Sequence, residues 1–157
     1  MNTSEQGIKL LHHFEGCKLK AYKCPAGVWT IGFGNTTYED GSKVKEGDTI
    51  TQERANELFK RIIKRFEQRV LEKIKRPLKQ HEFDALVSFC YNAGTSYKNK
   101  AGQWVDYNIW KKAEAQDKDI REYWETLAVT GGGKKLPGLV RRRAAEVQLY
   151  IAGVFVA

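Results

Sequence analysis

The pattern of apolar residues predicts a long amphipathic helix in the middle of the chain. Between Thr51 and Pro77 apolar residues recur every three or four positions, which places their side chains on one face of a helix. These residues are Ala55, Leu58, Phe59, Ile62, Ile63, Phe66, Val70, Leu71 and Ile74. Thr51 is a typical N-cap residue, and Pro77 is expected to end the helix. At ~1.5 Å per residue the helix is roughly 35–40 Å long, enough to join two lobes.

A short helix is also predicted near the N-terminus. Its apolar positions are Ile8, Leu11 and Phe14. Thr3 and Ser4 are good N-cap types, and Thr3 with Gln6 is a candidate capping box. Gly16 is placed to end this helix.

After residue 17 the pattern changes from helical spacing to short strands. The stretches KLKAY (18–22) and VWTIGF (28–33) are aromatic and β-branched, and they flank a Cys-Pro-Ala-Gly turn. This arrangement predicts a β-hairpin. Asp40-Gly41 is a turn signal that predicts another hairpin and a third strand. Residues from about 17 to 49 are therefore expected to form a small antiparallel sheet.

The second half of the chain is predicted to be helical. The segment 78–94 reads as a buried helix, two short helices are anchored by Trp110 and Trp124, and Pro137 begins a last helix. The intervening stretches SYKNKAGQW and GGGKK are interpreted as loops, the second one flexible.

The order of these elements predicts an α+β fold. Residues 1–157 are expected to form a single domain with lobes at about 15–55 and 75–157. The small N-terminal lobe holds the antiparallel sheet. The long helix joins it to a helical C-terminal lobe, on which the first helix packs.

Charge and composition narrow the class of partner. The 157 residues carry a net charge of +8, which favours an anionic partner such as nucleic acid, a membrane surface or an acidic wall polymer. No apolar run is long enough to span a bilayer, and the first residues lack the layout of a signal peptide, so we expect synthesis in the cytoplasm. The three cysteines and three histidines show no zinc spacing, so neither a metal nor a cofactor is expected.

Glu15 is a candidate general acid. It lies at the predicted C-terminal end of the first helix, where carbonyl dipoles disfavour a negative charge and so favour the protonated carboxyl. A protonated carboxyl suits a proton donor. A solvated glutamate at a helix end is the alternative, and position alone favours that alternative.

Four motifs resemble the phage-type lysozymes (endolysins) of glycoside hydrolase family 24. The segment FEGCKLKAYKCPAGVWTIGFGNT is similar to the family's Glu-x8-Asp-x5-Thr motif, with Glu15, Cys24 and Thr30 at its three positions. DTITQERANELF is similar to the start of the family's long helix, QHEFDALVSFCYNAG to its FDALVSF segment, and GLVRRRAAEVQLY to its ending. The motifs cover nearly the whole chain in the family's order.

This resemblance implies a lysozyme-like fold with an active cleft between two lobes. It implies hydrolysis of the β-1,4 bond between N-acetylmuramic acid and N-acetylglucosamine in bacterial peptidoglycan. Glu15 would protonate the leaving oxygen, and Thr30 would hold the attacking water or stabilise the developing sugar cation. The residues expected to bind substrate are Tyr22, Asn35, Thr36 and Asn92. For Asn92, capping of its helix is an equal alternative.

Two departures from the family's pattern leave the role of Cys24 open. Cys24 stands where the family has an aspartate, and Asn35 where it frequently has a histidine. A paired-carboxylate mechanism needs a second anionic group, whereas a thiol with a reference pKa of ~8.5 is mostly neutral at pH 7. Cys24 is therefore a thiolate nucleophile, a thiolate base or a spectator that leaves water positioning to Thr30. A small turn residue before Pro25 is the structural alternative.

The remaining reactive side chains have structural explanations. Cys90 lies on an apolar helical stripe and is expected in the core. Cys17 is expected to be structural, although it could pair with Cys24 under oxidation. A partly exposed helix face explains His12 and His13.

Two other functions compete with hydrolysis. A lytic transglycosylase acts on the same polymer with one catalytic acid, and the sugar's 6-hydroxyl replaces water. A non-catalytic, basic wall- or nucleic-acid-binding protein is the other alternative. No RNA-binding motif or recognition-helix pattern is present, so no nucleic-acid partner is expected.

The expected partners follow from the resemblance. Peptidoglycan is the substrate, and the protein is expected to be a monomer. A pore-forming holin is implied for its release from the host cytoplasm to the periplasm or cell wall. The basic last helix is a candidate for outer-membrane contact, although packing of its apolar tail against the core is preferred. At least one of Arg141, Arg142 and Arg143 is expected to pair with Glu146.

Overall fold

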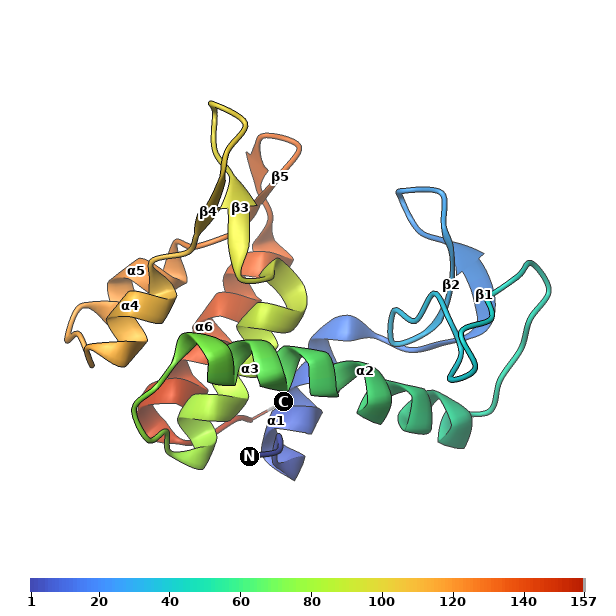
Figure 1. The fold of residues 1–157 in the computed structure, drawn as a ribbon, viewed down its shortest axis with the longest axis horizontal. Helices are drawn as coiled ribbons and strands as arrows, with labels where there is room; N and C mark the ends of the chain where they lie inside the picture. Colours follow the sequence, from blue (N-terminus) through green and yellow to red (C-terminus); the bar gives the residue numbers. More distant parts are fainter. Residues whose placement is uncertain (157) are drawn as a thin grey trace. The chain divides into compact units, whose positions relative to one another are not determined.

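The computed structural model describes residues 1–156 and divides the chain into two compact units. The hairpin unit is Leu11–Arg65, and the helical unit is Met1–Leu10 with the chain from Phe66 onward. The helices are α1 (Glu5–Glu15), α2 (Gln52–Lys73), α3 (Gln80–Ala93), α4 (Ile109–Glu114), α5 (Ile120–Glu125) and α6 (Pro137–Ala152). The strands are β1 (Lys18–Lys23), β2 (Trp29–Gly32), β3 (Ser96–Lys98), β4 (Trp104–Asp106), β5 (Thr130–Gly131) and β6 (Lys134–Lys135), as Figure 1 shows. Helices and short antiparallel sheets together confirm the predicted α+β class.

The predicted first hairpin is confirmed. Strands β1 and β2 pair antiparallel, with Tyr22 opposite Thr30. The Cys24 N–H donates to the Val28 carbonyl at 3.0 Å, and the Gly27 N–H donates to the Cys24 carbonyl at 2.8 Å. Gly27 has φ +79°, which a glycine adopts without strain and other residues rarely do. The Pro-Ala-Gly composition of this turn therefore explains why the chain reverses here.

The prediction of a third strand is wrong within the described residues. The turn at Asp40-Gly41 forms, but its flanks make only the isolated bridge between Thr37 and Lys43. A second isolated bridge joins Lys20 to Thr49. The segment has few apolar residues to bury, so a full strand would gain little packing.

Of the two predicted N-cap residues, Ser4 caps the start of α1. The Gly7 N–H donates to the Ser4 hydroxyl at 3.4 Å. Thr3 donates from its backbone and its hydroxyl to the buried carboxylate of Glu67, at 2.5 and 2.7 Å. The side chain of Gln6 binds the carbonyl of Gly153 at 3.0 Å. The predicted Thr3–Gln6 capping box is wrong because both side chains have partners far away in the sequence.

Helix α2 follows the predicted stripe and begins at the predicted cap. The Arg54 N–H donates to the Thr51 hydroxyl at 3.1 Å. The helix ends at Lys73, earlier than the predicted stop at Pro77. The N–H groups of Lys75 and Arg76 instead bind the carboxylate of Glu114, at 2.9 and 3.2 Å. The helix therefore ends where a side chain offers these N–H groups another acceptor.

A fully buried carboxylate connects the helices of the helical unit, in which α3 and α6 lie side by side (Figure 1). Glu146 on α6 accepts hydrogen bonds from the Ser88 hydroxyl at 2.6 Å and the Trp124 indole at 3.1 Å. It also pairs with Arg142 at 3.2 Å and Arg143 at 2.8 Å. The predicted ion pair with Glu146 and the predicted core position of Trp124 are both confirmed; Trp110, the other predicted anchor, is also buried.

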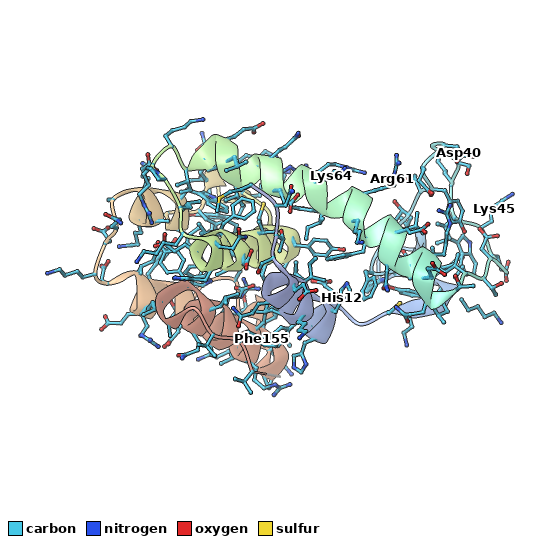
Figure 2. All side chains as sticks on the ribbon, turned by 90° about the horizontal axis from the view of Figure 1, so that it is seen from below. His12, Asp40, Lys45, Arg61, Lys64 and Phe155 are labelled. Atoms are coloured by element: carbon cyan, nitrogen blue, oxygen red, sulfur yellow. The ribbon has the colours of Figure 1, made fainter. Side chains whose placement is uncertain are left out.

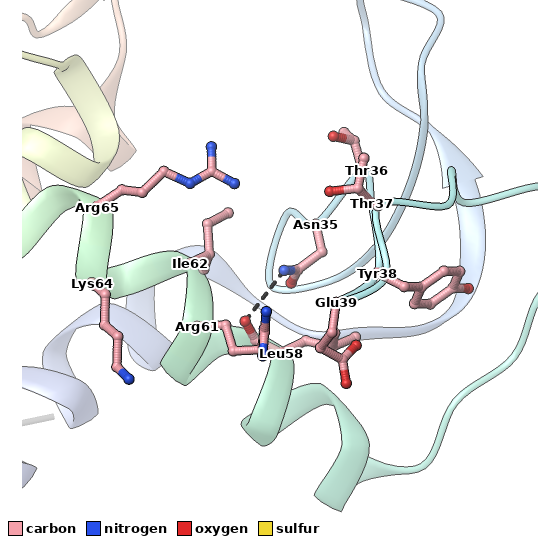
Figure 3. A pocket seen from close by; sticks show the side chains of 11 residues that line it. Asn35, Thr36, Thr37, Tyr38, Glu39, Leu58, Arg61, Ile62, Lys64 and Arg65 are labelled. Carbon is pink, nitrogen blue, oxygen red and sulfur yellow. Dashed lines mark hydrogen bonds between the residues drawn. The ribbon is translucent and has the colours of Figure 1, made fainter.

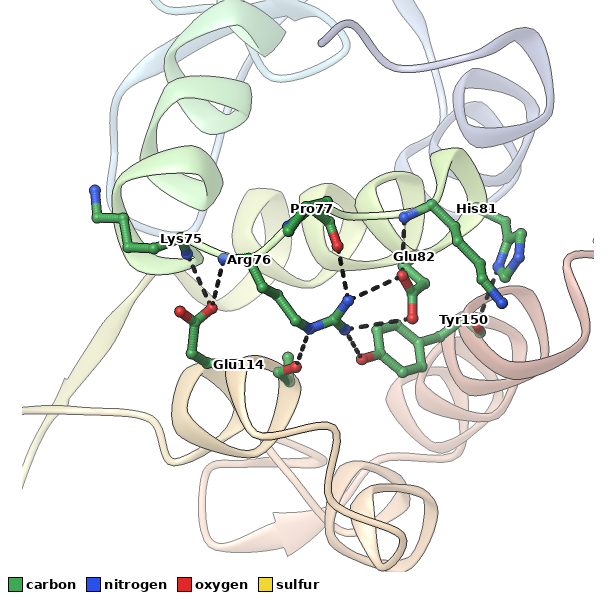
Figure 4. Close-up of polar contacts among 9 residues, drawn as sticks. Lys75, Arg76, Pro77, His81, Glu82, Glu114 and Tyr150 are labelled. Carbon is green, nitrogen blue, oxygen red and sulfur yellow. Dashed lines mark hydrogen bonds and ion pairs between the residues drawn. The ribbon is translucent and has the colours of Figure 1, made fainter.

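Arg76 makes a second polar centre in the same unit (Figure 4). Its guanidinium donates to the carbonyl of Ala113 at 2.7 Å, to the hydroxyl of Tyr150 at 3.1 Å and to Glu82 at 3.3 Å. Burial by itself raises the pKa of Glu82, but the Lys79 N–H and the Arg76 guanidinium outweigh burial and lower it. Arg76 thus links the α4, α6 and α3 regions through charge-assisted hydrogen bonds.

Both segments interpreted as loops are hairpins in the structure. Within SYKNKAGQW, strands β3 and β4 pair around a turn in which Asn99 accepts from the N–H groups of Gly102 and Gln103, at 3.0 and 2.9 Å. Within GGGKK, Gly132 and Gly133 have φ of +58° and +78°, and β5 pairs with β6 across them. Two successive residues with positive φ are what a tight hairpin turn requires.

In the C-terminal tail, the Phe155 N–H donates a hydrogen bond to the Gln6 side chain at 3.1 Å. Val156 is 82% exposed. The preferred packing of the tail is therefore confirmed only up to Phe155. Among residues 1–156, every helix is too short or too polar to cross a membrane.

Candidate active site

The β1–β2 turn brings Cys24 and Thr30 together. Cys24 follows the last residue of β1 and is half-buried, and Thr30 lies on β2 with 4% of its surface exposed. Hydrogen bonds from the backbone of Val28, then of Ala26, lower the pKa of the Cys24 thiol, and the Thr30 hydroxyl adds to them. The turn thus favours the thiolate form of Cys24 at the family's aspartate position.

The Thr30 hydroxyl can donate its proton to only one acceptor at a time, either the Val28 carbonyl or Cys24. Its hydroxyl donates to the carbonyl of Val28 at 2.9 Å. A hydroxyl has one proton, so donation to a Cys24 thiolate requires it to rotate away from Val28. In its present orientation the Thr30 oxygen is available as an acceptor for the thiol proton.

Glu15 is the last residue of α1, as predicted, and its side chain is half-buried. Gly16 follows with φ +64°, a left-handed conformation that turns the chain from the helix toward β1. Both histidines of the last helical turn precede it. Glu15, Cys24 and Thr30 all belong to the hairpin unit.

His12 is partly exposed, as predicted, and its ring also takes part in the hydrophobic packing. Its ring stacks on Phe33 with centroids 4.1 Å apart and meets Phe59 edge-on at 4.6 Å (Figure 2 labels His12). Burial lowers the pKa of His12, so its neutral form is favoured. Since Phe33 lies outside helix α1, sequence spacing within the helix gave no signal for this contact. His13 is exposed, as predicted.

Two of the predicted substrate-binding residues line a cavity of about 430 Å³ between the loop after β2 and helix α2 (Figure 3). Asn35 is 6% exposed, and its amide donates to the Leu58 carbonyl on α2 at 3.4 Å. Thr36 is exposed at the cavity wall. The third residue, Tyr22, is exposed on β1 directly across from Thr30.

Asn92 belongs to the helical unit, whereas the other predicted residues belong to the hairpin unit. Its side-chain oxygen accepts a hydrogen bond from Arg143. The end of α3 is closed instead by the Gly94 N–H, which donates to the Cys90 carbonyl at 2.8 Å. Capping, the structural alternative for Asn92, is therefore not what its side chain does.

The other two cysteines differ from Cys24. Cys90 is fully buried, as predicted, and burial raises the pKa of its thiol to about 12. Cys17 is half-buried, and all three cysteines are free thiols in the structure. No group of three metal-binding side chains occurs among residues 1–156.

Comparisons with known proteins agree on one family. A family model described as phage lysozyme matches residues 12–146. The endolysin of Acyrthosiphon pisum secondary endosymbiont phage 1 is 34% identical over 150 residues, covering 96% of this chain and 98% of that protein. The solved endolysin from Escherichia coli O157:H7 phage FAHEc1 has a TM-score of 0.83 and 36% identity, covering 100% of this chain and 98% of that chain.

A second solved structure extends the similarity to a muramidase outside the endolysins. The muramidase domain of SpmX from Asticaccaulis excentricus has a TM-score of 0.78 and 26% identity, covering 96% of this chain and 97% of that chain. The fold is therefore that of a lysozyme. The chain belongs to the phage lysozyme family. It is an enzyme, a lysozyme that hydrolyses bacterial peptidoglycan, and the predicted resemblance and activity are confirmed.

The thiol environments predict a distinct alkylation profile. Thiolates react with iodoacetamide and thiols do not, so Cys24 should be alkylated at lower pH than a small free thiol under the same conditions. Cys90 should stay unmodified in the folded protein because it is fully buried. Peptide mass mapping between pH 6 and 9 measures both. Alkylation of Cys24 with the pH profile of the small thiol would contradict the effect of the turn.

Proposed function

We propose that the enzyme cleaves the β-1,4 bond between N-acetylmuramic acid and N-acetylglucosamine with Glu15 as general acid and Cys24 in place of the second carboxylate. The observation that carries this assignment is the contact of Cys24 with Thr30 in a turn that favours the thiolate. The two residues stand at the second and third positions of the family's motif. Glu15 stands at its first position, at the end of α1.

Glu15 would donate its proton to the glycosidic oxygen as the bond to the sugar breaks. Cleavage without that proton would leave an alkoxide, which is a poor leaving group, and general acids supply roughly 10²- to 10⁴-fold in rate. Glu15 is half-buried at the end of α1, at the first position of the family's motif, which supports this role.

Cys24 would act as a thiolate on the other side of the reacting sugar carbon. As nucleophile it would form a covalent bond to that carbon; as base it would take a proton from the attacking water. Paired carboxylates about 5–5.5 Å apart serve the first chemistry and pairs about 6.5–9.5 Å apart the second. Thr30, buried beside the thiol, would orient Cys24 or the water.

The remaining assignments follow from the family's pattern. Tyr22, Asn35, Thr36 and Asn92 are proposed to bind substrate. Residues 1–157 would act as a single, monomeric catalytic domain. A holin would release it from the host cytoplasm to the periplasm or wall, and the basic α6 is the candidate for outer-membrane contact. The transglycosylase alternative uses the same acid and differs in its product.

Replacement of Glu15 by glutamine should abolish wall lysis, because the amide keeps the shape of the side chain and cannot act as an acid. We expect a loss of roughly 10²- to 10⁴-fold in the initial rate of turbidity clearing of purified walls. Glu5→Gln is the matched control, since Glu5 is exposed in the first turn of the same helix. Wild-type clearing by a folded Glu15→Gln variant would remove Glu15 from catalysis.

Three substitutions at Cys24 distinguish a chemical role from a spectator. Cys24→Asp should keep substantial activity, because it restores the family's residue. Cys24→Ser should lose most activity, since a serine hydroxyl hardly ionises, and Cys24→Ala should be at least as poor. Cys17→Ala, which removes a neighbouring thiol, should be close to wild type. If Cys24→Ala clears walls as fast as the wild type, Glu15 and Thr30 suffice.

A further inference from the structure

The cavity beside Asn35 has two walls of different chemistry (Figure 3). One wall is the loop after β2, which presents the hydroxyl side chains of Thr36 and Thr37. The other wall is the α2 face that carries Arg61, Lys64 and Arg65. A volume of about 430 Å³ is within the range of small-ligand sites and exceeds what a single ion fills.

Among the cations of this cavity, Arg61 acts on Glu39 through its charge, which helps to lower the pKa of that carboxyl. Arg61, Lys64 and Arg65 make no hydrogen bond or ion pair with any residue that the structure describes. Other arginines of the chain are paired, for example Arg142 with Glu146 at 3.2 Å. Arg61 and Lys64 project from α2 in Figure 2. The cavity therefore offers free guanidinium and ammonium donors.

The only carboxylate in the cavity lining is already engaged. Glu39 forms a two-pronged ion pair with Arg54, one prong of which, from Nη2 to Oε1, measures 2.7 Å. The hydrogen bonds from Arg54 lower the pKa of Glu39, so its charge is retained and neutralised at the cavity edge. Glu39 thus interacts mainly with Arg54 and additionally with the charge of Arg61, and the three cations of the lining exceed its single negative charge.

The spacing of these cations is unfavourable for the helix itself. Arg61 is three residues before Lys64 and four before Arg65 on α2, and like charges at these separations repel one another. A bound anion between the helix and the loop would relieve this repulsion.

The loop wall is held in place before any ligand binds. The Asn35 amide ties its start to α2 through the Leu58 carbonyl. The Tyr38 hydroxyl donates to Asp48 at 2.7 Å, and the Tyr38 N–H donates to the Ser42 carbonyl at 2.9 Å. Because this wall is already fixed, less conformational entropy is lost when a ligand binds.

We infer that this cavity binds the carboxylate groups of the peptide side chains that peptidoglycan carries on its muramic acid residues. The inference rests on the proposed function, because the polymer that Glu15 cleaves brings these peptides with it. Arginine guanidinium groups match planar carboxylates with two parallel hydrogen bonds, and the threonine hydroxyls offer further donors. Arg61 and Arg65 are then positioning residues for the substrate, outside the reacting centre.

The test compares two soluble substrates: glycan chains that carry tetrapeptides, and the same chains after an amidase has removed the peptides. The double variant Arg61→Gln/Arg65→Gln should raise KM for the peptide-bearing chains roughly 3- to 10-fold, because each exposed charged contact contributes modestly. Its kcat, and its KM for peptide-free chains, should match the wild type. Calorimetry should show the same loss of affinity for the free tetrapeptide.

Two control variants separate recognition from net charge. Lys60→Gln/Lys118→Gln removes two exposed cations outside the cavity lining and should leave the ratio of the two KM values unchanged. Arg61→Lys/Arg65→Lys keeps the positive charges but lacks the planar guanidinium groups. Its affinity should lie between that of the Arg61→Gln/Arg65→Gln variant and that of the wild type.

Equal losses on both substrates, or the same loss in the Lys60/Lys118 control, would overturn the inference in favour of a general charge effect. Calorimetric binding of inorganic phosphate at the Arg61/Arg65 site without binding of the tetrapeptide would also overturn it, in favour of a phosphate site. A wild type that cleaves neither substrate refutes the proposed function instead, and the calorimetric comparison still tests the cavity.

Discussion

The register of the β1–β2 hairpin is the constraint on which both the core of the hairpin unit and its chemistry depend. The hydrogen bond from Cys24 to Val28 closes the turn and sets Tyr22 opposite Thr30. Successive side chains of a strand alternate between two faces, so a slip of one residue would exchange the faces. In the observed register Ala21 and Ile31 pack with Val44, and Cys24 meets Thr30. The same register thus serves packing and the proposed catalysis.

In the helical unit the corresponding constraint is a buried charge. Glu146 is fully buried, and its carboxylate is stable there because hydroxyl, indole and guanidinium donors surround it. These donors come from α3, α5 and α6, which explains why the helices hold a fixed arrangement within the unit. Removing Glu146 would deprive the buried guanidinium groups of Arg142 and Arg143 of their carboxylate partner, a defect that typically costs several kcal/mol.

The features predicted from sequence were those that depend on residues close together in the chain. Thr51 caps α2, Gly16 ends α1, and Pro-Ala-Gly closes the first hairpin, because each acts through its own backbone or its nearest neighbours. In the GGGKK segment, the glycine-rich composition predicts a flexible loop, whereas Gly132 and Gly133 provide the positive φ of a tight turn. The pairing of β5 with β6 depends on the backbone angles of the turn, which the amino-acid composition alone does not specify.

The features that sequence reasoning missed depend on partners distant in the chain. Thr3 binds Glu67 instead of capping its helix, and the stacking of His12 on Phe33 had no signal in the sequence. The residues of the candidate sites also differ in whether a local sequence motif predicts them or only the fold brings them together. Glu15, Cys24 and Thr30 follow from one local motif, whereas the roles of Arg61 and Arg65 emerge only when the loop from Asn35 to Gly41 is seen beside α2.

The central claim is that the enzyme splits the glycan with water while Glu15 supplies the proton. Mass analysis of the sugar ends released from purified peptidoglycan tests it most directly. Hydrolysis predicts fragments that end in a free reducing N-acetylmuramic acid, which incorporates the oxygen of ¹⁸O-labelled water. Fragments that end in the 1,6-anhydro form, lighter by one water and free of the label, would contradict the account and identify a lytic transglycosylase.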